Sequence, residues 1–274
     1  MSNLRTVDYS EDFLKEFEDL YKIVVLAGYE TIEIDGFVLY KTHDNGWALL
    51  VYLGNKAIVK VPEFITEIAS MAFAGNRFIT SVILPSKLQK VNYRAFADCY
   101  NIRDVVFPDS ITVIEEEAFK NCIQLHQVTF PKNLETIKKK AFCCCSSLHH
   151  VAFPKKLRRI ETQAFSHGDL REIYIPDSVE IIDKEAFAGN RNLVKLSLPS
   201  GIEVAWSAFM ACGKTAVIKS NSVEIEIRKK EGSEQCIYTE QTIFVCPIFL
   251  NKVSQEYIWT ADMGRRIKVA MRNS

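Results

Sequence analysis

Three of the five histidines in the chain, His126, His149 and His150, are the residues whose type and spacing first suggest chemistry. His126 and His149 are 23 residues apart, which is the period of a repeat described below, so we expect their rings to stack in neighbouring units. Stacked imidazoles can share a metal ion or repel each other when protonated. We expect no acidic or thiolate ligand at the same height, and therefore predict no metal site. The three side chains are then either contacts for an acidic or aromatic partner or ordinary surface histidines.

Three cysteines, Cys99, Cys122 and Cys145, also recur at intervals of 23 residues. Thiols in register suggest a metal site, but the matching position in other repeats is not cysteine. It is occupied by Asn76, Gly168 and Asn190. We therefore interpret the cysteines as small buried residues that fill space. Cys143 and Cys144 lie outside this register, and we expect them to be exposed and open to oxidation.

Sequence motifs of familiar catalytic sites are absent. The chain contains no glycine-rich phosphate loop, no Gly-x-Ser-x-Gly elbow, no His-Glu-x-x-His pair and no Cys-x-x-Cys pair. We therefore predict a non-enzymatic protein without a cofactor. An enzyme confined to residues 214–274 would be small and would lack recognisable catalytic residues.

Charge and hydropathy exclude other classes of partner. Thirty-four basic residues balance thirty-four acidic ones, so no net charge directs the protein to nucleic acid or to an anionic membrane. No run of about 18 apolar residues is present to span a bilayer. Residues 1–8 lack the basic start and apolar run of a secretory signal. Buried reduced thiols also suit the eight cysteines better than a disulfide framework does, so we expect a cytoplasmic protein.

A repeat must position these residues, and two sequence registers define it. The dipeptide Ala-Phe recurs with its alanine at positions 72, 95, 118, 141, 164, 186 and 208, so the intervals are 23 or 22 residues. An apolar-Pro pair keeps step, with its proline at positions 62, 85, 108, 131, 154, 176 and 199. One unit cannot bury its apolar side alone, so stacked units must share a core. The sequence therefore predicts a solenoid of about seven rungs over residues 61–213.

A single unit shows how the repeat works. Val128 and Phe130 alternate inward as a short strand, which Pro131 ends because proline has no backbone N–H. Ala118 and Phe119 place a small residue beside a large one, so neighbouring rungs can approach closely while the ring fills the core. The pattern resembles that of the BspA-type leucine-rich repeats, whose units read Leu-x-x-Val-x-Leu-Pro-x-x-Leu-x-x-Ile-x-x-x-Ala-Phe-x-x-Cys.

This resemblance covers about residues 61–212, more than half of the chain. It implies an α/β repeat protein, namely a leucine-rich-repeat solenoid with a parallel sheet on its concave side. It also implies recognition or adhesion, because the family is associated with those roles and not with catalysis. Many members of the family are secreted, and this chain differs from them in that we identify no signal sequence in residues 1–8.

The segments that flank the repeat are predicted to differ from it. In residues 1–60 we expect a helix over 8–27 and a β-hairpin, with strands at 37–40 and 48–53 joined through the turn Asp44-Asn45-Gly46. This N-terminal helix and β-hairpin would cap the first rung. Residues 214–274 contain β-like runs at 223–227 and 242–246, which indicate either a β-rich C-terminal cap or a small module.

Alternation along the strands assigns one set of side chains to the interior and another to the concave face. The inward positions stay apolar, whereas the outward columns vary in chemistry from unit to unit, as expected of a recognition surface on a constant scaffold. The residues that we predict to contact a partner are Arg103, Asp104, His126, Gln127, Thr129, His149, His150, Arg171, Glu172, Tyr174 and Lys195. An idle solvated sheet is the alternative.

Runs of charge are predicted to pair between rungs. Residues 115–117 are glutamates, residues 138–140 one unit later are lysines, and Arg158 lies in register between two glutamates. We interpret these runs as ladders on the convex side, where exposed pairs contribute little stability.

The leading functional hypothesis is a cytoplasmic protein-interaction module that binds a protein partner on the concave face, as an intracellular inhibitor or effector. The family resemblance suggests an alternative, an adhesin-like protein that binds ligands at a cell surface. A third hypothesis is a structural protein that assembles by pairing an open solenoid end with a second copy.

Overall fold

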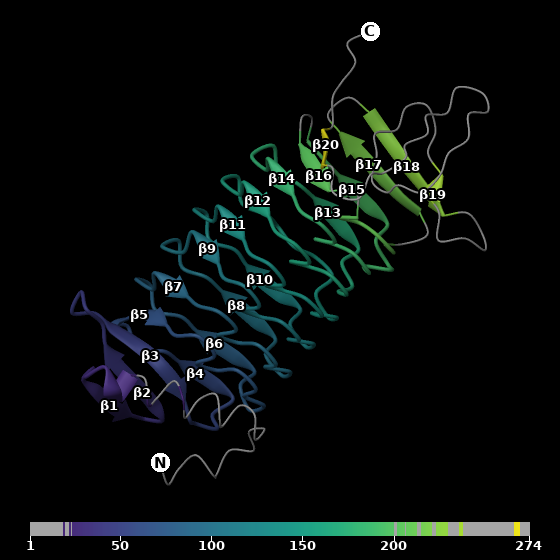
Figure 1. The fold of residues 1–274 in the computed structure, drawn as a ribbon. Coiled ribbons are helices and arrows are strands. Elements are labelled where there is room, and N and C mark those ends of the chain that lie inside the picture. The colour runs from purple at the N-terminus through teal and green to yellow at the C-terminus, as the bar shows by residue number, and fades with distance from the viewer. Residues whose placement is uncertain are drawn as a thin grey trace.

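The computed structural model describes the backbone of residues 19, 22, 24–199, 202–205, 207–212, 215–220, 223–229, 236–237 and 266–268, and side chains as far as residue 212. Within these limits the repeat units stack one upon another to form a solenoid, and further strands extend it to β1 (Thr31–Ile34) at one end and to β18 (Val223–Lys229) and β19 (Cys236–Ile237) at the other (Figure 1). Each unit forms one rung with three sides. Two sides carry short parallel strands, and the third is built of turns.

The first side of most rungs carries a strand of three residues, and the surface that this side exposes is termed the strand face. Its N-terminal half is a parallel sheet of β4 (Ile58–Lys60), β6 (Ser81–Ile83), β8 (Asp104–Val106) and β10 (Gln127–Thr129). Its C-terminal half consists of β13 (Glu172–Tyr174), β15 (Lys195–Ser197), β17 (Thr215–Ser220), β18 and β19 (Cys236–Ile237). Among the described residues, the rung between the halves pairs only through a bridge from His150 to Glu172, so the ladder is interrupted after β10.

The second side carries shorter strands, most of them two residues long. They are β5 (Ile65–Ile68), β7 (Lys90–Val91), β9 (Val113–Ile114), β11 (Thr136–Ile137), β12 (Arg159–Ile160), β14 (Ile181–Ile182) and β16 (Glu203–Ala205). β20 (Arg266–Lys268) pairs antiparallel with β16. The repeated prolines make the corner before this side. For the six prolines from Pro62 to Pro176 the carbonyl accepts a hydrogen bond from the amide three residues later, as from Ile111 to Pro108 and from Leu134 to Pro131. Proline has no amide for the strand that it ends, so it suits the corner.

The third side, which holds the Ala-Phe pairs, consists of turns. The amides of Arg94, Phe96 and Asp98 donate to carbonyls of the next rung, whereas those of Ala95 and Ala97 donate three residues back. Arg94 and Asp98 both have positive φ, at 52° and 60°. Because every second amide is bonded to the next rung, the i to i−4 ladder of an α-helix cannot form. The expected α/β class is therefore corrected to a parallel β-solenoid, since the described repeats contain strands and turns only.

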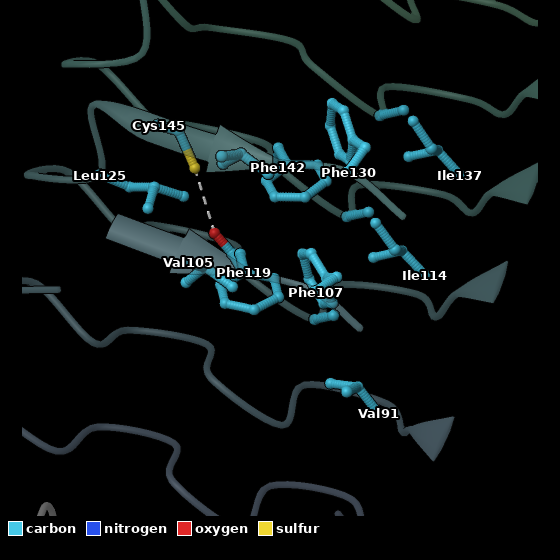
Figure 2. Close-up of a cluster of buried hydrophobic side chains, with 14 of the residues drawn as sticks. Val91, Val105, Phe107, Ile114, Phe119, Leu125, Phe130, Ile137, Phe142 and Cys145 are labelled. Carbon is cyan, nitrogen blue, oxygen red and sulfur yellow. Dashed lines mark hydrogen bonds between the residues drawn. The ribbon is translucent and has the colours of Figure 1, made fainter. Parts of the chain in front are cut away.

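The core is a stack of phenylalanine rings. The seven rings of the Ala-Phe pairs, from Phe73 to Phe209, lie 4.7 to 5.4 Å apart between centroids and within 6° to 9° of parallel. Figure 2 shows two of them, Phe119 and Phe142, in neighbouring rungs, with Phe107 and Phe130 beside them. The rings of the latter pair meet the stack edge-on, at 82° to 83°. Such aromatic pairs contribute about 0.5–1.5 kcal/mol each beyond burial, so the repeated ring is a main source of stability.

Antiparallel strands cover the first rung of the second side. β1 pairs with β2 (Phe37–Lys41), β2 pairs with β3 (Trp47–Tyr52), and β3 pairs in parallel with β5. The ring of Tyr52 extends the aromatic stack, 5.5 Å from Phe73. Of the helix expected over 8–27, most residues lie outside the described part of the chain, and residues 19, 22 and 24–26 are helical. Val24 is buried in a small cluster with Val38 and Leu50.

The chain continues the first-side sheet beyond the repeats. β17 pairs in parallel with β15, β18 pairs antiparallel with β17, and β19 pairs antiparallel with β18. The strand expected at 223–227 thus falls within β18, whereas the run expected at 242–246 lies outside the described residues.

Candidate interaction surface

The pairing register of the strands sets which side chains are neighbours on the strand face. In the N-terminal half one row contains Ser81, Asp104 and Gln127, and the next contains Ile83, Val106 and Thr129. In the C-terminal half Glu172 lies beside Lys195, and Tyr174 lies beside Ser197. This is the register that the predicted columns assume, except that the interrupted ladder does not pair Gln127 with His150. The predicted contact residues therefore fall into two separate groups.

The two histidines expected to stack are each bonded to a different group. Nδ1 of His126 lies 3.4 Å from the carbonyl oxygen of Gln124. Nδ1 of His149 lies 3.0 Å from Oδ2 of Asp169 in the next rung, and 3.2 Å from the carbonyl oxygen of the same residue. His150 is exposed. A carboxylate therefore does lie within reach of one histidine, contrary to the expectation that none would.

Asp169 is not among the residues that the sequence predicts for the surface, yet several predicted residues meet there. Its carboxylate accepts a 2.6 Å hydrogen bond from Asn192 Nδ2, and the guanidinium of Arg171 lies 3.8 Å away. The signal in the sequence is the shortened interval of 22 residues between residues 164 and 186. The missing residue shortens the turn around Gly168, so Asp169 takes the place of two residues in the rung before.

A second polar network lies on β13 and β15. The hydroxyl of Tyr174 donates a 2.8 Å hydrogen bond to Oε2 of Glu172, and the ammonium of Lys195 lies 4.9 Å from the centroid of the tyrosine ring. Contact with Tyr174 and the charge of Glu172 raise the pKa of Lys195. The three predicted residues therefore do come together, and their side chains hold one another in place.

The N-terminal half of the face has fewer internal contacts. Oγ of Ser81 donates a 2.9 Å hydrogen bond to Asp104, which connects β6 to β8. Arg103, Gln127 and Thr129 are exposed, and no described acidic side chain lies within ion-pair distance of the Arg103 guanidinium. This half therefore presents polar groups that are free to bind something outside the chain.

The cysteine column is structural, as the sequence predicts. The thiol of Cys99 donates to the carbonyl of Phe73 at 3.0 Å, and the thiol of Cys145 donates to the carbonyl of Phe119 at 3.2 Å (Figure 2). Burial raises the pKa of both thiols. Asn190 at the matched position bonds through Nδ2 to the carbonyls of Phe165 and Phe187. These cysteine and asparagine side chains thus donate hydrogen bonds to backbone carbonyls of the core.

Cys143 and Cys144, which directly precede Cys145 in the sequence, differ in burial. Cys143 is buried and only 6% exposed, so its expected exposure is wrong, whereas Cys144 is half-buried. Their thiols share a hydrogen bond, with the sulfur atoms 3.5 Å apart, and do not form a disulfide. Burial is the largest cause that raises the pKa of Cys144 to about 11, and its contact with Cys143 adds to the shift.

The predicted charge ladders are confirmed. Lys138 lies 2.7 Å from Glu115, Lys139 lies 2.8 Å from Glu116, and the Arg158 guanidinium lies 3.4 Å from Glu180. Each pair joins one rung to the next. These charges are therefore already partnered within the chain, which leaves the strand face as the candidate site.

Two classes of site find no support in the described residues. No three histidine, cysteine, aspartate or glutamate side chains there converge as metal ligands. No helix in the same part of the chain has the length and apolar character needed to cross a bilayer.

Comparison with known proteins agrees with the repeat. A family model described as the BspA type leucine rich repeat region matches residues 55–171 and 159–231, with six copies of its repeat. A solved leucine-rich-repeat protein from T. pallidum is 29% identical, with a TM-score of 0.62, and the match covers 67% of this chain and 89% of that one. No curated protein matches the chain.

Further solved structures are more distant. A leucine-rich-repeat protein from Bacteroides ovatus is 19% identical over 70% of this chain and 69% of its own, with a TM-score of 0.42. A leucine rich cell surface protein from Faecalibacterium prausnitzii is 20% identical over 76% of this chain and 60% of its own, with a TM-score of 0.46.

The rung architecture and its similarity to the T. pallidum structure define a leucine-rich-repeat solenoid. Because the family model matches more than half of the chain, the protein belongs to the BspA-type leucine-rich-repeat family. Proteins built of leucine-rich repeats are generally interaction or surface modules, and none of these matches points to a catalytic family.

Proposed function

We propose that the protein binds another protein through the strand face and acts without catalysis. One contrast carries the proposal. On β6, β8 and β10 the inward residue is valine each time, whereas the outward residue beside it changes from serine to aspartate to glutamine. The backbone and register of the three strands are the same, so packing does not require this variation. Varied side chains on a constant scaffold suit selective recognition.

The networks of the C-terminal half also support binding. Glu172, Tyr174 and Lys195 hold one another, and Asp169 holds His149 and Arg171. A side chain that is already ordered loses less conformational entropy when a partner binds. These residues are therefore preorganised contacts, while the freer residues of the N-terminal half can adapt.

A finer part of the proposal is an inhibitor or effector that works in the cytoplasm. Cys99, Cys122 and Cys145 are free thiols, and so are the neighbouring Cys143 and Cys144. Lysis of cells directly into urea that contains iodoacetamide, followed by mass spectrometry, tests the compartment, because every free thiol then reacts. We expect Cys144 to be recovered as an unpaired thiol. A disulfide at this residue in native material would overturn the cytoplasmic assignment and leave the binding proposal standing.

The binding proposal is tested by capture from a native lysate with quantitative mass spectrometry. The immobilised wild type is compared with a triple variant of the strand face, Arg103→Glu, Gln127→Lys and His150→Glu. The matched control is Lys184→Glu, an exposed charge reversal on the turn side. We expect the captured protein to fall at least tenfold for the face variant and to stay unchanged for the control. Equal capture by both variants, with matching circular dichroism spectra, would refute binding through the strand face.

A further inference from the structure

The exposed apolar side chains of the strand face are concentrated in its N-terminal half. Three of them, Ile58, Ile83 and Val106, lie on β4, β6 and β8. Three more exposed apolar side chains, Phe78, Tyr100 and Ile123, lie in the turns that lead into β6, β8 and β10, and the six together are termed the apolar patch. In the described C-terminal half, only Tyr174 and Val194 are large, apolar and exposed on this face. The two halves of the face therefore suit different kinds of contact.

The apolar patch has no role within the core. The interior of these rungs is already filled by the phenylalanine stack and the inward valines, which are buried. Val106 is 60% exposed and Ile58 is 64% exposed. Ile83 and Val106 are direct partners in the sheet register, so the exposed surface is continuous from one rung to the next. Single exposed apolar residues are ordinary, but a continuous set indicates a contact with another molecule.

The charges around the apolar patch favour an acidic partner. Lys60 lies on β4 and Arg103 lies directly before β8, and both are exposed. Within the described part of the chain, neither cation has a carboxylate at ion-pair distance. Asp104 in the same region is an anion whose carboxylate accepts a hydrogen bond from Ser81. Lys60 is the register partner of Ile83 and so lies at the end of the row of Ile83 and Val106, so this region exposes two cations and one carboxylate around the aliphatic side chains.

The spacing of the rungs favours an α-helix as the occupant. The ring centroids of Phe73, Phe96 and Phe119 advance by 4.7 and 4.9 Å per rung. One turn of an α-helix advances by about 5.4 Å, so successive turns keep pace with successive rungs to within about 0.6 Å. Alternate residues of an extended strand advance by about 6.6 Å, which differs from the rung spacing by nearly 2 Å. A helix along the stacking direction can thus place one side chain over each rung.

We infer that the apolar patch binds an amphipathic α-helix of the partner protein, with an aliphatic stripe against Ile83 and Val106 and carboxylates directed at Lys60 and Arg103. The inference rests on the proposed function, because it names the kind of partner segment that the same face takes. The C-terminal half, with its polar networks, then contacts the partner beyond the helix.

Synthetic peptides test the inference directly. The probe is a fluorescein-labelled helical peptide of about 18 residues with leucine at i, i+3, i+4 and i+7 and glutamate at the positions that flank this stripe. One control peptide has the same composition with the leucines scattered around the helix. A second carries lysine in place of glutamate, and a third alternates leucine with glutamate to favour an extended chain. Fluorescence anisotropy is expected to show binding of the probe at least tenfold tighter than that of any control.

A pair of valine variants locates the binding site. Val106→Glu places a carboxylate in the apolar patch and is expected to weaken binding of the probe at least tenfold. Val194→Glu is the matched control because Val194 is 58% exposed on the other half of the face, and it should leave binding unchanged. Thermal melting by circular dichroism checks that both variants remain folded. Equal affinity for probe and scattered peptide, or equal weakening by both variants, would overturn the inference.

Failure of the helix inference and failure of the proposed function give different results. If the strand-face variant loses its captured partner but the probe does not bind, the face binds proteins through another kind of segment. If capture is the same for the strand-face variant and the wild type, the proposed function itself fails.

Discussion

The interior of the solenoid and its strand face come from the same strands but obey different rules. Inside, every rung repeats the same ring, stacked within 6° to 9° of parallel on its neighbours. Outside, consecutive rungs present Ser81, Asp104 and Gln127 at one position. The inner side chains must fill a closed space to the density of a crystal, and the outer ones need only tolerate water or a partner. Variation is therefore confined to positions where packing does not oppose it.

The largest loss of stability is expected when one ring is removed from the phenylalanine stack. Phe119→Ala deletes a fully buried side chain that stacks on Phe96 at 4.9 Å and on Phe142 at 5.4 Å. We expect the free energy of unfolding to fall by about 3–5 kcal/mol, because the lost burial is joined by a cavity that flanking rungs cannot close. Urea denaturation followed by circular dichroism measures the change. A loss below about 1 kcal/mol would show that the stack is not the main stabilising element.

The rates at which the three consecutive cysteines are alkylated give a second test of the difference between the interior and the surface. Cys145 belongs to the buried column, whereas Cys144 is half-buried and its pKa is raised to about 11. The thiolate is the reactive form, so at neutral pH we expect Cys144 to react with iodoacetamide roughly a hundredfold more slowly than an ordinary thiol. Its rate should rise about tenfold per pH unit between pH 7 and 10, because the thiolate fraction does.

Peptide mass spectrometry of the alkylated protein separates Cys144 from Cys145. Cys145 should stay unmodified throughout this pH range, because its thiol is enclosed and bonded to the carbonyl of Phe119. Protein unfolded in urea is the control, in which both thiols should react at the ordinary rate. A rapid reaction of Cys145 in the folded protein would mean that the interior opens to solvent.

The first ring at the N-terminal end tests the packing there. A Cβ atom added at Gly54 would lie 2.3 Å from Cζ of Tyr52, whose ring is buried and extends the phenylalanine stack. We expect Gly54→Ala to cost about 1–3 kcal/mol through overpacking. Gly28→Ala is the control, because a Cβ atom there meets nothing within 4 Å, although its φ of +78° adds a conformational cost. Equal losses in urea denaturation would show that Tyr52 can move aside.

Much of the fold was predictable because equivalent positions of successive repeats must make the same packing contacts. The Ala-Phe register predicts the stacked rings, and the matched Asn190 predicts that the cysteine column fills space in the core. Each follows from contacts between equivalent positions of adjacent rungs, which a fixed period encodes directly. The pairing of Glu115 with Lys138 was predictable for the same reason.

Three features of the structure were not predicted from the sequence, and each has a physical cause that the repeat pattern does not show. The third side becomes turns because the amides of Arg94 and Phe96 bond to the next rung, and local sequence carries no record of that neighbour. Asp169 lies beside His149 in a unit that is one residue shorter than those before it, so the 23-residue period does not align the two side chains. Alternation along the strand already places Val106 outward beside the inward Val105, but the apolar patch also includes turn residues such as Tyr100, whose exposure alternation does not predict.

The smallest expected change in the free energy of unfolding comes from a substitution on the strand face itself. Gln127 is exposed on β10, next to the inward Val128. We expect Gln127→Ala to change the free energy of unfolding by no more than about 0.5 kcal/mol, because no packing contact is lost. Urea denaturation measures stability, and the capture assay measures partner binding on the same sample. Weaker capture at unchanged stability would separate recognition from the scaffold, whereas a loss above about 1 kcal/mol would make this outward position part of the scaffold and remove the difference between the interior and the strand face.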